Sequence, residues 1–88
     1  MAKFMAIHTM PPGSLNQQQM SKLAEAGQQD PVVHGYRSFA NLSEGKVVCI
    51  MEAPRKEDVA SWFKKMQVPC DSITQMEFEG DRGSVRAA

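Results

Sequence analysis

The sequence predicts an α+β protein with one four-stranded antiparallel sheet and two helices on one of its faces. Hydrophobic periodicity and turn residues place the elements in the order strand, helix, strand, strand, helix, strand along 88 residues. The first and third strands are apolar on both faces, as the two central strands of a sheet ordered 4-1-3-2 would be. Order and patterning together indicate the ferredoxin-like βαββαβ arrangement.

Turn and capping residues bound the first strand and the first helix. Residues 3–10 form an apolar run that ends at two prolines, which predicts a buried strand. Ser14 is followed three residues later by Gln17, a spacing typical of a capping box, in which each side chain satisfies a backbone N–H. We therefore expect a helix over residues 15–26, with Gly27 as its C-terminal stop.

The second half of the chain supplies the remaining three strands and one helix. Residues 32–40 alternate as a strand, and a hairpin turn leads to residues 46–52, whose five successive apolar residues predict a strand covered on both faces. Residues 56–66 read as a helix, because acidic residues lie near the start and lysines near the end. Residues 73–79 alternate as the last strand of the sheet.

Length and charge bound what the protein can do. We expect a single domain over residues 1–80 and a flexible C-terminal tail over residues 81–88. The 10 basic and 10 acidic side chains cancel, which argues against nucleic-acid or membrane partners. The chain shows no secretion signal or membrane span, and two cysteines are fewer than disulfide-stapled secreted domains usually carry. We expect a cytoplasmic protein with free thiols.

The sheet of such a small domain has one face that the helices leave open. The strands carry apolar residues on that face too, and an apolar patch of several hundred Å² is rarely left exposed to water. A second copy of the chain packing sheet against sheet is the simplest cover. We therefore expect a homodimer of the α+β-barrel type, with a monomer that uses this face for a ligand or partner as the alternative.

Two histidines suggest a metal site, although no close-spaced ligand motif is present. His8 lies on the first strand and His34 on the second, so they could converge only across the third strand or across a dimer interface. Cys49 or Glu52 of the third strand could complete a nickel or zinc site, since imidazole suits both metals. The alternatives are histidines hydrogen-bonded to backbone or water and a Cys49 that only packs in the core.

Several features recur along nearly the whole chain: an opening strand, a turn before the first helix, a Ser-aromatic step, a cysteine on the third strand, an Ala-Pro pair and a later proline before the last strand. The residues are Phe4, Met5, Pro12, Gly13, Leu15, Ser38, Phe39, Cys49, Ala53, Pro54, Pro69 and Ile73. In these features the chain resembles a family of small ferredoxin-like bacterial proteins, long catalogued as a domain of unknown function, whose best-known branch binds nickel as a homodimer. The resemblance implies this fold, a homodimer and nickel as the metal.

The chain departs from that family at two positions that bear on the site. Many members carry a histidine just before the Ser-aromatic step and another in the second helix, where this sequence has Arg37 and Trp62. Arg37 could instead bind a carboxylate or phosphate, and Trp62, together with Tyr36, could wall a metal-free pocket by stacking. The alternative is that Arg37 is a strand-edge cation and Trp62 ordinary core packing.

Three classes of function follow from these residues. The leading hypothesis is a non-enzymatic cytoplasmic homodimer that binds a metal ion, nickel first, or a small ligand. The alternative is a small-molecule enzyme of the dimeric α+β-barrel type, monooxygenase-like or isomerase-like, although nothing in the sequence pairs a base with an orienting acid. A third class is an interaction module without a ligand.

Overall fold

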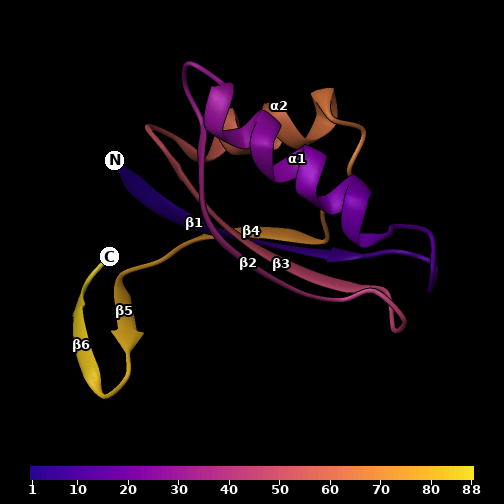
Figure 1. The fold of residues 1–88 in the computed structure, drawn as a ribbon. Helices are drawn as coiled ribbons and strands as arrows, with labels where there is room; N and C mark the ends of the chain where they lie inside the picture. Colours follow the sequence, from indigo (N-terminus) through magenta and orange to yellow (C-terminus); the bar gives the residue numbers. More distant parts are fainter.

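The computed structural model describes all residues, 1–88. The chain forms two helices and six strands (Figure 1), which run as follows: β1 Ala2–Thr9, α1 Gln17–Gln29, β2 His34–Asn41, β3 Lys46–Ala53, α2 Lys56–Lys65, β4 Ser72–Gln75, β5 Phe78–Asp81 and β6 Ser84–Ala87. Neither α1 nor α2 has the length and hydrophobicity that a membrane-spanning helix needs.

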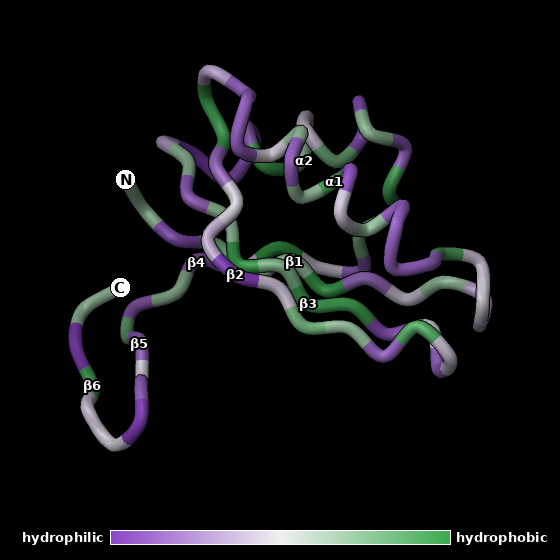
Figure 2. Tube along the Cα trace, viewed as in Figure 1, coloured by the Kyte–Doolittle hydropathy of each residue, from purple (hydrophilic) through white to green (hydrophobic).

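The first four strands form one antiparallel sheet in the order β2-β3-β1-β4, and this confirms the predicted fold class and strand order. The central strands β1 and β3 pair along their whole length, from Ala2 opposite Ala53 to Thr9 opposite Lys46. Both helices lie on the same face of the sheet (Figure 1). Hydrophobic residues are concentrated on β1 and β3 in the middle of the molecule, as Figure 2 shows.

The core lies between the sheet and the helices, and the two helices contribute unequally to it. Alternate residues of the central strands are buried beneath the helices. Helix α2 buries Val59, Trp62 and Phe63 against them. Helix α1 buries only Gly27, so its other apolar residues stand at the edge of the core rather than inside it. The face of the sheet beneath α1 is therefore incompletely filled.

Helix α1 begins and ends later than the sequence predicts. Its N-cap is Asn16, whose side chain accepts a hydrogen bond from the backbone N–H of Gln19, while the Gln19 side chain accepts one from the N–H of Asn16. This is the capping box that we expected two residues earlier, at Ser14. Ser14 does not cap because its N–H is held in a turn by the carbonyl of Pro11. Gly27 lies inside the helix instead of ending it.

The last eleven residues differ from the expected strand end and tail. The fourth strand stops at Gln75, and β5 and β6 form a separate two-stranded hairpin on the side of the sheet away from the helices (Figure 1). Arg82 and Gly83 both have positive φ, 50° and 93°, which is the backbone of the type I′ turn that favours hairpins. A tight turn at Arg82-Gly83 therefore pairs residues 84–87, which we had assigned to a tail, with residues 78–81, which begin inside the expected last strand.

Candidate functional site: a cavity beneath helix α1

A cavity of about 220 Å³ lies between α1 and the sheet. Twelve of its eighteen lining residues are hydrophobic, and they come from both helices, from the three strands β1, β2 and β3, and from the neighbouring loops. The lining is His8, Met10, Leu15, Met20, Leu23, Ala24, Gly27, Gln28, Gly35, Tyr36, Arg37, Ser38, Val47, Cys49, Met51, Trp62, Phe63 and Val68.

The unequal packing of the two helices explains why the cavity exists. Trp62 and Phe63 of α2 fill one end of the space above the sheet, with their rings 5.0 Å apart and nearly perpendicular. The middle of α1 presents small or flexible residues to the same layer, and Gly27 lets the helix approach the indole of Trp62. At the end of α1, the Gln28 side chain donates a 2.6 Å hydrogen bond to the carbonyl of Gly35 on β2. The helix is thus tied to the sheet at its C-terminal end, while its apolar residues Leu23 and Ala26 pack against the core only partly buried.

His8 is the polar group at the inner end of the cavity. Its side chain is 1% exposed, and its ring packs against Phe63 with the centroids 4.6 Å apart. Nδ1 lies 2.8 Å from the carbonyl oxygen of Pro69. Because a carbonyl can only accept, Nδ1 carries the proton, and in the neutral ring Nε2 presents a lone pair. Nε2 is buried and has no hydrogen-bond partner in the protein. The backbone-bonded histidine that we considered from the sequence is therefore correct for one ring nitrogen only.

Cys49 is the predicted site residue that shares the cavity with His8. Cys49 lies on β3 opposite Ala6 of β1, and Val47, two residues before Cys49, lies opposite His8. The side chains of Cys49 and His8 are therefore both on the helix-covered face of the sheet. The thiol is free and buried, and burial raises its pKa to about 11. At neutral pH the sulfur is therefore a protonated thiol, inert as a nucleophile but able to bind a metal that displaces the proton.

His34 and Glu52 form a second, separate pair. They are directly opposite each other on β2 and β3. Glu52 lies between two buried residues of β3, so strand alternation turns it to the open face of the sheet. The four predicted metal ligands thus divide into two pairs on opposite faces, and no group of three or more His, Cys, Asp or Glu residues in the chain could hold a metal ion.

Trp62 lines the cavity with its indole 5% exposed, in the place we expected for a stacking wall. Tyr36 and Arg37 border the cavity at a β-bulge in β2, where the register with β3 shifts. They also border a second depression on the open face. The Tyr36 ring belongs to that side, because its hydroxyl donates a hydrogen bond to Glu79. The polar groups of the predicted pocket residues Tyr36, Arg37 and Trp62 therefore do not meet in one place.

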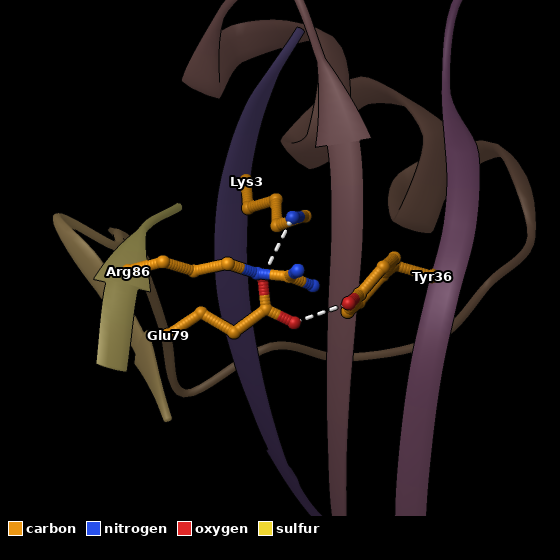
Figure 3. Close-up of polar contacts among 4 residues, drawn as sticks. All are labelled: Lys3, Tyr36, Glu79 and Arg86. Atoms are coloured by element: carbon orange, nitrogen blue, oxygen red, sulfur yellow. Dashed lines mark hydrogen bonds and ion pairs between the residues drawn. The ribbon is translucent and has the colours of Figure 1, made fainter. Parts of the chain in front are cut away.

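A cluster around Glu79 was not predicted from the sequence. Figure 3 shows its carboxylate between Lys3, whose Nζ is 2.8 Å from Oε1, and the hydroxyl of Tyr36. Arg86 of the hairpin lies 3.9 Å from the same carboxylate, and the Lys3 ammonium is 4.3 Å from the centre of the Tyr36 ring. The hydrogen bond from Lys3, followed by that from Tyr36, lowers the pKa of Glu79. This cluster attaches the C-terminal hairpin to the open face of the sheet.

Fold and cavity together define a small α+β protein with a largely apolar cavity that a buried histidine lines. A sequence model described as "SCO4226-like: nickel responsive protein SCO4226-like" matches residues 4–76. The chain therefore belongs to the nickel-responsive SCO4226-like family, and the resemblance seen in the sequence is confirmed.

The crystal structure of SCO4226 from Streptomyces coelicolor A3(2) has the same fold. It is superimposed with a TM-score of 0.75 at 23% sequence identity, and the match covers 90% of this chain and 100% of that one. Among curated proteins none matches. The family match ends at residue 76, so the β5–β6 hairpin lies beyond the segment that defines the family.

Proposed function

We propose that the protein is a homodimeric binding protein that takes a transition-metal ion, nickel first, at His8. The observation that carries this proposal is the buried Nε2 lone pair of His8, which no group of the protein uses. The description of the family as nickel responsive supports nickel as the metal. Imidazole is a good ligand for nickel, and in this role the metal is the bound ligand rather than a catalyst.

The residues around His8 supply only some of the ligands that a bound metal ion needs. Cys49 lies on the neighbouring strand two residues from the position opposite His8, and the thioethers of Met10, Met20 and Met51 line the same cavity. One chain supplies no third ligand among His, Cys, Asp and Glu. The proposed site therefore needs donors beyond these two residues, from the methionines, from solvent or from a second chain.

Isothermal titration with Ni²⁺, Zn²⁺ and Cu²⁺ tests this assignment. We expect His8→Ala to weaken nickel binding by at least about tenfold, because even residues that only orient a metal ligand typically matter by that factor. His34→Ala is the matched control on the open face and should leave the affinity unchanged. Loss of nickel binding in His34→Ala but not in His8→Ala would show that the metal binds at His34 and Glu52 instead.

The pH dependence of binding tests the role of Cys49. Because its thiol is protonated up to a pKa of about 11, coordination releases one proton, and nickel affinity should rise about tenfold per pH unit around neutrality. Cys49→Ser should flatten this dependence. An affinity with the same pH slope in the serine variant would remove Cys49 from the site.

The homodimer is proposed through the open face of the sheet. Strand alternation places on it apolar side chains that the helices do not cover, and one of them, Phe39, is 63% exposed. The apolar residues of this face are Met5, Ile7, Phe39, Val48 and Ile50. Ile50→Lys should give a monomer in sedimentation velocity, whereas Ser61→Lys on the exposed side of α2 should not change the oligomeric state. An Ile50→Lys protein of unchanged sedimentation would contradict this interface.

A further inference from the structure

The unused nitrogen of His8 indicates a partner that can donate a hydrogen bond. It is the one buried side-chain nitrogen or oxygen in the chain that lacks a partner, and a buried acceptor left unpaired is unfavourable for the folded state. With Nδ1 bonded to the carbonyl of Pro69, Nε2 of the neutral ring can accept but cannot donate. The matching group on a ligand is therefore an O–H or an N–H.

The surroundings of this nitrogen favour an organic molecule over a water molecule. A buried water typically makes about three hydrogen bonds. Of the other polar residues of the lining, Gln28 and Ser38 are exposed at the edge of the cavity. The Tyr36 hydroxyl binds Glu79 on the open face, and Arg37 lies opposite Ile50 of that face, so neither polar group is at His8. Around the imidazole the walls are apolar, and Phe63 is in contact with the ring. A water molecule at Nε2 would therefore make one good hydrogen bond instead of the usual three.

The size and charge of the cavity narrow the class of molecule. Its volume of about 220 Å³ exceeds the roughly 150 Å³ of an apolar cavity known to bind benzene. The lining contains no Lys, Asp or Glu, and Arg37 lies at the bulge with its guanidinium carbon 5.9 Å from the centre of the Tyr36 ring. A charged organic molecule, which the imidazole cannot coordinate as it would a metal ion, would lie among apolar walls without a counter-charge, which is unfavourable. The ligand is therefore neutral and one ring in size.

We propose that the cavity beneath α1 binds a small neutral aromatic molecule whose single O–H or N–H group donates a hydrogen bond to Nε2 of His8. Phenols and azoles have this chemistry. The ring lies among the side chains of Met51, Trp62 and Phe63, while the donor group reaches the imidazole at the inner end. This proposal does not depend on nickel binding, because it uses the free nitrogen and the apolar volume of the metal-free protein.

Trp62 provides the measurement, because it is the only tryptophan in the chain and its indole lines the cavity. Phenol and toluene, which differ by the hydroxyl, are titrated into metal-free protein in the presence of EDTA, and binding is followed by chemical-shift changes of the Trp62 indole N–H. We expect both to bind saturably, with phenol about tenfold tighter because it satisfies the buried acceptor.

Three variants make the test specific. His8→Phe keeps an aromatic ring against Phe63 but removes the acceptor, so toluene should still bind and the preference for phenol should vanish. Ala24→Phe should fill the cavity from α1 and abolish the binding of both compounds. Ala60→Phe, the same change at an exposed position of α2 outside the cavity, should change neither affinity.

Absence of saturable binding, or a phenol preference unchanged in His8→Phe, would overturn the proposal. Retained toluene binding in His8→Phe shows that this variant has kept the cavity, so a lost preference is not a folding defect. Nickel titration of the same proteins separates the two ideas. Phenol binding without nickel binding would refute the proposed function alone, and nickel binding without phenol binding would refute this inference alone.

Discussion

Replacing Gly27 by alanine tests how α1 lies over the cavity. A Cβ atom built at Gly27 would lie 3.6 Å from Cη2 of Trp62 and 3.7 Å from the backbone nitrogen of Gly35, which are ordinary van der Waals distances. The methyl group is therefore accommodated without movement. Glycine inside a helix is about 0.8–1 kcal/mol less favourable than alanine, so Gly27→Ala should stabilise the protein by about 1 kcal/mol.

Thermal unfolding at a fixed protein concentration measures this effect. For a domain of this size, a gain of 1 kcal/mol corresponds to a rise in Tm of about 4–8 °C. Gly45→Ala is the contrasting variant, because Gly45 has a φ of +73° and an added Cβ would lie 1.9 Å from the carbonyl oxygen of Met10. Gly45→Ala should lower the free energy of unfolding by more than about 2 kcal/mol. A lower Tm for Gly27→Ala than for the wild type would mean that α1 lies closer to Trp62 than described, and would refute the reasoning.

Three further predictions concern titratable groups. Because hydrogen bonding, first from Lys3, lowers the pKa of Glu79 below its unfolded value, this carboxylate stabilises the docked hairpin above the unfolded pKa. That stability is lost as the pH falls through the folded pKa, so Glu79→Gln should abolish the acid-induced release of the hairpin seen by amide hydrogen exchange. Iodoacetamide should modify the half-buried Cys70 before the fully buried Cys49 in peptide mass mapping, since burial raises both thiol pKa values and that of Cys49 to about 11; faster labelling of Cys49 would contradict its place in the core. Because the Nε2 lone pair of His8 can serve one partner at a time, saturating nickel should weaken phenol binding to the wild type, and unchanged affinity would put the two ligands at separate sites.

The central part of the fold could be predicted because burial leaves a direct signal in the residue pattern. Apolar residues on both faces identified β1 and β3 as the middle strands, and the structure confirms their order. The start of α1 could not be predicted, since Ser14 and Asn16 each precede a glutamine by three residues. The choice between them depends on hydrogen bonds of the preceding turn, including one from Gly13 to the carbonyl of Leu42, 29 positions along the chain.

The sequence predicts where single residues of the site lie but not which of them come together. Alternation along β1 puts His8 on the same face as the buried Phe4 and Ala6, but the unused nitrogen depends on the carbonyl of Pro69, far away in sequence. Strand alternation also separates Cys49 from Glu52, which are three residues apart and so point to opposite faces. Grouping them in one metal site overlooked this period of two. The cavity could not be foreseen, since it reflects how little of α1 is buried.

The contact between Lys3 and Glu79 joins residues separated by 76 positions, so it links the two ends of the chain. During synthesis, β1 leaves the ribosome first, and the carboxylate that binds its lysine is made among the last residues. Tyr36 from β2 binds the other oxygen of the same carboxylate, so the complete cluster requires β1, β2 and the hairpin together. A chain that ends before residue 79 therefore lacks the group that joins its first strand to its C-terminal end.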